Sequence, residues 1–261
     1  MASLISVITV CFNESCDKIQ NTFNSILEQD YPFIEFIVID GNSSSETINS
    51  IQPYLKSIHH FVSEPDNGVF DAMNKGLKLA SGTWICFMNV GDSFYKHDIL
   101  SKLIYNYDGI SEIIYGNVFK KKVGLVFSPY KLNKYTFYHS GICHQSMLIK
   151  ASAFNKIGFF DLNVNLYGDA DWVMKAFING IKFNYINEIV SYYEGGGLSS
   201  DIRNLRDDRK QFLKKYFSLI EIIFYFIYSS LNKSLIKVKR MLRMNFIYHL
   251  FILLVCLMFC N

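Results

Sequence analysis

The sequence lacks the features that define several common protein classes. Its six cysteines form no CxxC pair and several lie inside apolar runs, which argues against a zinc site or disulfide framework and favours a reducing, cytoplasmic compartment. The formal net charge is only +3, so no nucleic acid partner is expected. Repeats and low-complexity linkers are missing, and 50% hydrophobic residues supply ample material for a globular core.

Glycine-rich phosphate cradles and a leader peptide are missing as well. No GxGxxG follows the first apolar run and no GxxxxGK[ST] occurs, which disfavours dinucleotide and P-loop binding. The opening residues MASLISVITVCF contain no basic region and no small-residue cleavage site. Their short, β-branched apolar run therefore predicts a buried strand rather than a signal peptide.

Strand-like and helix-like patterns alternate from residue 4 to about residue 120. This rhythm predicts an α/β fold, a Rossmann-like and mostly parallel central sheet with helices on both faces, and ligands at the carboxyl ends of its strands. After about residue 125 the rhythm becomes irregular, as in an α+β half. The expected strands are 4–12, 34–40, 60–63, 83–88 and 113–119, and the expected helices are 16–29, 45–55, 69–80 and 97–107.

Polar and acidic residues follow each of the first four expected strands. These strand ends carry Asn13 and Glu14, then Asp40, then Glu64-Pro65-Asp66-Asn67-Gly68, then Asn89-Val90-Gly91-Asp92. Carboxylates gathered at one rim repel each other unless a cation or a hydrogen-bond donor compensates them. A divalent cation held by carboxylate and phosphate oxygens supplies that compensation, which points to a sugar nucleotide as ligand.

Three segments give the chain a family resemblance. The segments VITVCFN from Val7, EFIVIDG from Glu35 and SEPDNGVFDAMNKG from Ser63 resemble family 2 glycosyltransferases, and most closely bacterial polysaccharide enzymes of the colanic-acid type. The likeness covers about residues 4 to 200 and is most specific between Ser63 and Asp92. It implies a GT-A fold, a nucleotide-sugar donor with a UDP-sugar as first choice, a divalent metal (Mn²⁺ or Mg²⁺) and inversion at the anomeric carbon.

The resemblance also implies roles for single residues. In the donor pocket, Thr9 and Asn13 line the nucleotide, Asp40 accepts a hydrogen bond from the base, Asp71 lies near the ribose, and Asn74 and Lys75 lie near the phosphates. Asn89-Val90-Gly91-Asp92 occupies the DxD position of the family, with Asp92 as the only carboxylate and thus the metal ligand. One carboxylate, two phosphate oxygens and waters can satisfy an octahedral cation.

Inversion requires a base on the face opposite the leaving diphosphate, within reach of the acceptor hydroxyl. By position in the family pattern Asp169 is that base, and Asp171 is the alternative. Either one of the pair could instead cap a helix. Gly168 stands where the family usually has a glutamate, which leaves the orientation of the acceptor unassigned.

Two further segments resemble parts of the family's donor site. His144 and Gln145 precede a strand-like run and are candidate contacts of the donor or acceptor sugar, with a purely structural histidine as the alternative. The glycine-rich segment Glu194–Ser200 resembles a loop that folds over the diphosphate, with a plain connector as the alternative.

The C-terminal part of the chain is apolar and basic. Residues Phe246 to Cys260 are apolar or aromatic except for His249, and five Lys and Arg residues precede them between Lys233 and Arg243. The run is shorter than the roughly 20 residues that span a bilayer. Together with the apolar stretch Tyr216–Tyr228, it predicts a helical tail at an anionic membrane surface, with packing on the main domain as the alternative.

These patterns define the expected organisation and function. Residues 1–205 form the GT-A domain, with a nucleotide-sugar half (1–120) and an acceptor half (121–205), and residues 206–261 form the membrane-associated tail. The leading hypothesis is an inverting transferase at the cytoplasmic face of the inner membrane, extending a lipid-linked glycan. A nucleotidyltransferase and a catalytically silent sugar-nucleotide-binding subunit are the alternatives.

Overall fold

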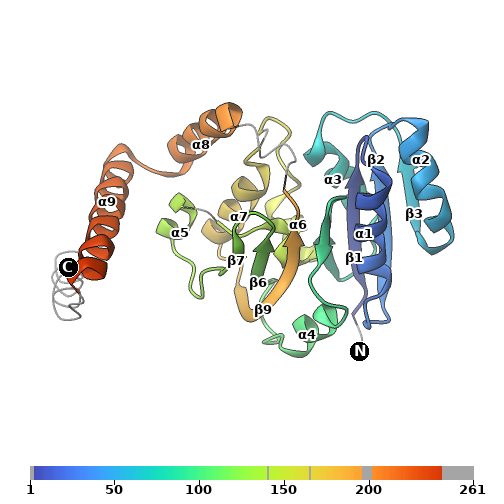
Figure 1. Cartoon of the computed structure of the whole chain (residues 1–261), viewed down its shortest axis with the longest axis horizontal. Helices are drawn as coiled ribbons and strands as arrows, with labels where there is room; N and C mark the ends of the chain where they lie inside the picture. The colour runs from blue at the N-terminus through green and yellow to red at the C-terminus, as the bar shows by residue number, and fades with distance from the viewer. Residues whose placement is uncertain (1–2, 140, 165, 196–201, 243–261) are drawn as a thin grey trace. The chain divides into compact units, whose positions relative to one another are not determined.

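The structure, a computed structural model, describes residues 3–139, 141–164, 166–195 and 202–242. The chain divides into two units, Met1–Lys210 and Gln211–Asn261. In the first unit the described strands form one nine-stranded sheet of order β3-β2-β1-β4-β8-β6-β9-β5, and β7 pairs with β6 off this path (Figure 1).

The N-terminal half of the sheet is parallel. It consists of β1 (Ile5–Cys11), β2 (Ile34–Asp40), β3 (His60–Ser63) and β4 (Trp84–Phe87). β1 pairs with both β2 and β4, and β3 pairs with β2, all in parallel register. The carboxyl ends of these strands therefore meet at one edge, where Cys11 lies opposite Asp40.

The second half of the sheet is mixed. β8 (Met147–Lys150) runs antiparallel between β4 and β6 (Ile113–Lys120), and β9 (Phe183–Tyr193) runs parallel to β6. β5 (Asp92–Phe94) and β7 (Gly124–Val126) pair in antiparallel fashion with β9 and β6. Parallel pairing thus holds the N-terminal half of the sheet, and the second half, where the sequence pattern becomes irregular, adds antiparallel strands to the predicted mostly parallel sheet.

Helices cover both faces of the parallel strands, because successive apolar side chains of β1 point to opposite faces of the sheet. Ile5 and Val7 join the core cluster that also contains α1 (Cys16–Leu27), whereas Ile8 faces α3 (Val69–Leu79) on the other side. Gly76 makes this contact possible, since a Cβ there would lie 2.4 Å from Ile8 Cγ2. The remaining helices of the first unit are α2 (Ser45–Ile51), α4 (Ile99–Tyr105), α5 (Lys134–His139), α6 (Ala151–Ile157) and α7 (Gly168–Ile178), with 3₁₀ turns at Gln52–Ser57 and His144–Ser146 (η2).

Most expected elements form with bounds within two residues of those predicted. The exception is the helix predicted over 45–55, which is α-helical only to Ile51 and continues as a 3₁₀ turn. Pro53 lies at the start of that turn and has no N–H to continue the helical hydrogen bonds.

Two helices end the described chain, α8 (Ile202–Tyr216) and α9 (Leu219–Leu242). Within the part of the chain that the structure describes, no helix combines the length and hydropathy that crossing a membrane requires. The apolar run predicted to be the membrane contact, Phe246 to Cys260, lies outside the described residues.

Candidate active site

Two loops at the carboxyl ends of β1 and β2 are tied together by short polar side chains. Asn13 adopts a left-handed backbone (φ 51°), which asparagine tolerates better than most residues. Its N–H donates to Ser43 Oγ at 2.8 Å, and its Oδ1 accepts from the Ser44 N–H at 2.9 Å. Asn13 is exposed at this rim, where the sequence predicts the nucleotide pocket.

Asp40 ends β2 as a fully buried carboxylate. Its Oδ2 accepts hydrogen bonds from the Ser43 N–H at 3.0 Å and from Ser63 Oγ at 2.6 Å. Its Oδ1 has no hydrogen-bond partner among the described residues, and the same holds for Oγ1 of Thr9, which is buried in β1. A buried acceptor without a donor is costly, so Asp40 Oδ1 is a natural place for a ligand N–H.

Three residues of α3 were predicted to contact the nucleotide-sugar donor, and their side chains make different contacts in the structure. Both ends of the buried Asn74 amide bond the Phe160 backbone, at 2.9 and 3.0 Å, so Asn74 braces the fold and is not available to phosphates. Lys75 Nζ donates to Pro65 O at 2.7 Å and to Glu64 at 2.9 Å, and Glu64 raises the pKa of Lys75. Asp71 accepts from the Asn67 N–H at 2.9 Å, which orders the loop before the helix.

Asp92 is the centre of the site. It is 6% exposed and begins β5 directly after the Asn89–Gly91 turn. Gln145 Nε2 donates to its Oδ2 at 2.7 Å, and the Glu194 N–H donates to its Oδ1 at 3.2 Å. Thr22 on α1 fixes the turn, since its hydroxyl donates to Asp92 O and accepts from the Gly91 N–H.

Burial raises the pKa of Asp92 to about 6. The Gln145 amide, the His144 ring and the Glu194 N–H each lower it, and the Glu194 carboxylate raises it slightly. A carboxylate with a raised pKa in a buried position favours a compensating positive charge nearby.

η2 connects the two halves of the site. Its first residue, His144, contacts Asp169 Oδ2 through Nδ1 at 2.9 Å, and its second, Gln145, holds Asp92. Asp169 Oδ1 also accepts from the Ala170 N–H at 2.7 Å, and the Asp169 side chain keeps 25% of its surface exposed. Two consecutive residues therefore bring the predicted metal ligand and the predicted base into one polar network.

Asp171 lies apart from that network. It is 2% exposed on α7 and forms an ion pair with Lys175 at 2.8 Å, one helical turn further on. Its burial and its ion pair with Lys175 indicate that Asp171 stabilises α7. Asp169 is the more exposed of the two, and it contacts His144.

The residues around Asp92 fit a divalent cation that the donor itself helps to hold. In the described residues, no group of three or more His, Cys, Asp or Glu side chains could bind a metal alone. Buried polar atoms without a hydrogen-bond partner among the described residues nevertheless remain at Asn89 Oδ1, in the turn before Asp92, and at His144 Nε2, next in sequence to the Gln145 that holds Asp92. Mg²⁺ and Mn²⁺ commonly use one or two carboxylates and complete their coordination with substrate phosphates.

Phe70 explains why glycine stands before Asp169. Gly168 is the first residue of α7, and a Cβ there would lie 2.5 Å from Phe70 Cε2. The Phe70 ring cannot move freely because it is buried and packs on Phe160, with ring centroids 5.3 Å apart. The space that a glutamate side chain would need is thus filled by an aromatic ring.

Replacing this glycine should destabilise the fold. We expect Gly168→Glu to lower the free energy of unfolding by about 1–3 kcal/mol, because overpacking forces neighbouring side chains to shift. Urea unfolding measures the change. Gly168→Glu combined with Phe70→Ala should lose less than the sum of the two single changes, and strictly additive losses would show that the Phe70 contact is not the cause.

The structure also has a cavity that the sequence did not predict, although Gly91 and Glu194 of its lining belong to segments that the sequence singled out. It lies beside Asp92, between α1, β5 and β9, and has a volume of about 380 Å³. Two residues that contact Asp92 were not among the predicted site residues. Thr22 bonds the Asp92 backbone and Glu194 bonds its carboxylate. Of the two, Glu194 lies in a segment that the sequence singled out. Thr22 was missed; a buried threonine on an apolar helix face is its only signal.

Comparison with known proteins identifies the family. Residues 6–163 match the model of glycosyl transferase family 2. A PGL/p-HBAD biosynthesis glycosyltransferase of Mycobacterium tuberculosis is 30% identical over 222 residues, which cover 82% of this chain and 84% of that protein. The chain therefore belongs to glycosyltransferase family 2, and the nucleotidyltransferase alternative loses its support.

Solved structures show the same fold at lower identity. S. aureus TarS 1-349 in complex with UDP-GlcNAc superposes with a TM-score of 0.64 at 20% identity, over 80% of this chain and 66% of that one. The mannosyltransferase PcManGT from Pyrobaculum calidifontis, in complex with GDP-Man and Mn²⁺, gives 0.61 at 16% identity over 81% and 62%. The chain spans less than two thirds of each solved chain. These likenesses establish a GT-A-like α/β fold.

Proposed function

We propose that the protein is an inverting glycosyltransferase that moves a sugar from a nucleotide-sugar donor to a glycan acceptor. The observation that carries the proposal is a pair of contacts made by adjacent η2 residues. Gln145 holds Asp92, the proposed metal ligand, and His144 holds Asp169, the proposed base. Asp40 and Asn13 lie at the ends of β2 and β1, where the nucleotide would bind. The halves 1–120 and 121–205 then serve the donor and the acceptor.

Asp169 acts as the base in this mechanism. It takes the proton from the acceptor hydroxyl as that oxygen bonds to the anomeric carbon, while the bond from that carbon to the phosphate oxygen breaks. The nucleoside diphosphate leaves on the opposite face, so the configuration inverts. His144 and the Ala170 N–H each hold one Asp169 oxygen, which fixes the carboxylate in place.

A divalent cation at Asp92 would offset the charge that develops on the departing diphosphate. Asp92 supplies the protein carboxylate, and Asn89 Oδ1 and His144 Nε2 are further buried atoms without a hydrogen-bond partner among the described residues. A Mn²⁺-bound structural neighbour supports this assignment. Gln145 and the Glu194 N–H orient the Asp92 carboxylate.

The donor is best sought among UDP-sugars, because a structural neighbour binds UDP-GlcNAc. We expect one or more of a panel of UDP-, GDP- and dTDP-sugars to raise the melting temperature of the full chain, and to raise it further with Mn²⁺. Slow hydrolysis of the same donor should accompany binding. Binding without any hydrolysis or transfer would support a catalytically silent subunit, and no binding at all would contradict the proposal.

We also propose that the second unit attaches the enzyme to the cytoplasmic face of the inner membrane, next to a lipid-linked acceptor. Large apolar side chains recur on α9 at three- and four-residue spacing, which places them on one side of the helix. Those that are at least 46% exposed are Leu219, Ile220, Ile223, Phe226, Ile227 and Leu231. A basic run follows them in the sequence and suits anionic headgroups.

Vesicle flotation tests the attachment. We expect the full chain to float with anionic vesicles, and Ile220→Asp with Phe226→Asp to reduce the bound fraction about tenfold or more, because burying each side chain contributes about 1.5–3 kcal/mol. Ile110→Asp is the matched control, since Ile110 is 65% exposed in the first unit. Equal loss in the control, or no flotation of the unaltered chain, would contradict the membrane role.

A further inference from the structure

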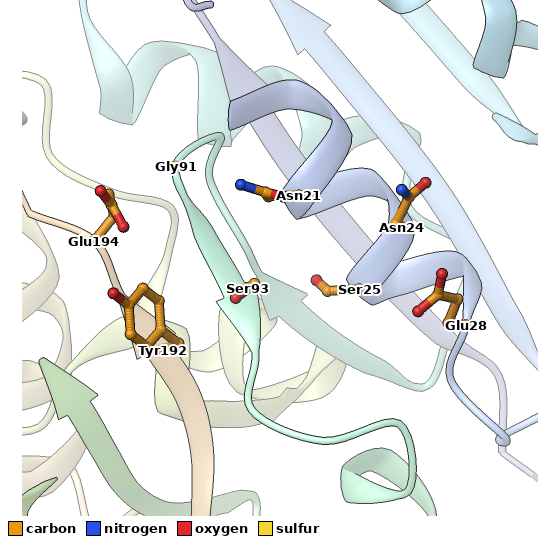
Figure 2. Close-up of a pocket in the computed structure, with 8 residues that line it drawn as sticks. All are labelled: Asn21, Asn24, Ser25, Glu28, Gly91, Ser93, Tyr192 and Glu194. Carbon is orange, nitrogen blue, oxygen red and sulfur yellow. The ribbon is translucent and has the colours of Figure 1, made fainter. Parts of the chain in front are cut away.

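A polar groove runs beside the candidate active site, and two of the residues that line it, Gly91 and Glu194, also belong to that site. Figure 2 shows α1 on one side of it, with β5 and β9 on the other. Its volume of about 380 Å³ lies in the range of small-molecule sites. The side chains that matter here are Asn21, Asn24 and Glu28 from α1, Ser93 from β5, and Tyr192 and Glu194 at the end of β9.

Strand alternation links this groove to Asp92. On β5, Asp92 and Phe94 are buried, so Ser93 between them points to the opposite side, as does its cross-strand partner Tyr192. Glu194 lines the groove with its side chain while its N–H holds the Asp92 carboxylate. The groove therefore begins directly beside the proposed reaction centre.

Tyr192 is the end of a row of stacked aromatic rings. Its ring stacks on Phe119 at 5.9 Å with planes 13° apart, and Phe119 stacks on Tyr95 at 5.9 Å. This row fixes the orientation of the Tyr192 ring at the groove. A rigid aromatic ring with a polar hydroxyl suits a ligand that has one apolar face and many hydroxyl groups, as a pyranose does.

The polar groups of the groove have hydrogen bonds to spare. Asn21, Glu28, Ser93 and the Tyr192 hydroxyl make no side-chain hydrogen bond to any other residue in the described ranges. Amides and hydroxyls both donate to and accept from sugar hydroxyls, and carboxylates accept from them. No Lys or Arg is among the groove-lining residues in the described part of the chain. Of the two glutamates, Glu194 pairs with Lys121, whereas Glu28 has no ion-pair partner among the described residues, so an anionic ligand is disfavoured.

We propose that this groove is a subsite for an uncharged stretch of the acceptor glycan, holding sugars remote from the hydroxyl that reacts. The proposal rests on the glycosyltransferase function proposed above and adds the chemical class of the acceptor. Binding energy from such remote sugars positions the reacting hydroxyl at Asp169.

The test uses neutral oligosaccharides of two to four hexoses, in α- and β-linked series, and titrates them into the full chain by calorimetry and saturation-transfer NMR. We expect at least one series to bind, Tyr192→Ala and Asn21→Ala each to weaken binding about tenfold, and Tyr192→Phe to retain most of it because the ring remains. Tyr105→Ala is the matched control, as it removes a tyrosine ring that is 88% exposed and does not line the groove. Oligomers of galacturonic acid should bind at least tenfold more weakly.

Failure of this proposal and failure of the proposed function give different results. No binding by any neutral series, or unchanged binding by Tyr192→Ala, overturns the subsite. Competition between UDP and the oligosaccharide at this groove overturns it too, since the groove would then belong to the donor. Donor-induced thermal shifts should be equal in the unaltered chain and in Tyr192→Ala; if no donor binds while oligosaccharides do, the transferase proposal fails and the glycan site stands.

Discussion

Asp169→Asn is expected to abolish glycosyl transfer while leaving donor binding intact. The substitution keeps the shape of the side chain and its capacity to bond the Ala170 N–H, but it removes the group that takes up the acceptor proton. Positioned general bases contribute about 10²–10⁴-fold to rate, so transfer should fall by at least that much. Donor affinity, measured by calorimetry with Mn²⁺, should stay within about threefold of the unaltered chain.

The matched control for this prediction is Asp171→Asn on the same helix turn. Asp171 is buried against Lys175, so its loss should lower the free energy of unfolding, with a raised population of unfolded chains. The rate per folded molecule should stay close to that of the unaltered chain. If Asp171→Asn removed transfer and Asp169→Asn did not, the base would be Asp171.

Asp92→Asn is expected to stabilise the ligand-free protein at pH 7 and to remove its response to metal and donor. Burial raises the pKa of Asp92 from 3.8 to about 6, so the folded state binds the proton more tightly than the unfolded chain does. The stability from this group is present below about pH 4 and is lost as the pH rises through about 6. At pH 7 the ionised, buried carboxylate therefore costs stability.

An amide at this position avoids that cost. We expect Asp92→Asn to raise the free energy of unfolding at pH 7 by about 1–2 kcal/mol. This gain is smaller than the free energy that corresponds to the pKa shift, because the amide cannot accept both hydrogen bonds that Gln145 and Glu194 donate to the carboxylate. The advantage over the unaltered chain should vanish near pH 4. Urea unfolding at a series of pH values measures both.

The metal response provides the second half of this test. Mn²⁺ with a bound donor should raise the melting temperature of the unaltered chain and leave Asp92→Asn nearly unchanged, since the cation loses its protein carboxylate. Asp66→Asn, in the loop that follows β3, is a suitable control. An equal metal-dependent shift in Asp92→Asn would show that the cation binds elsewhere.

The parallel half of the fold was predictable because its signals are local. β-branched runs such as IEFIVID predict β2 with its observed bounds, and short polar residues after the strands predict the rim where Asn13 and Asp40 lie. The antiparallel insertion of β8 and the placement of β9 beside β6 were not predictable. Those pairings depend on contacts between segments far apart in the chain, which no local pattern encodes.

The candidate site divides in the same way. Asp92 and Asp169 were predicted from their segments, and the structure links them through η2, whereas Asn74 was predicted near the phosphates and instead braces Phe160. A sequence motif gives the residue type at each position. It does not show which polar side chains make hydrogen bonds within the protein and are therefore not available to a ligand. The aromatic row beside the groove was missed for a related reason, since Tyr95, Phe119 and Tyr192 come from three separate segments.

The amino-acid sequence by itself determined the strand–helix alternation, the acidic strand ends and the family, because each is written in short stretches of the chain. The tertiary structure alone decided that η2 joins Asp92 to Asp169, that Phe70 excludes a glutamate at Gly168, and that Tyr192 faces a groove beside Asp92. These relations arise from packing and strand register, which bring distant residues within a few ångströms only once the whole sheet has formed.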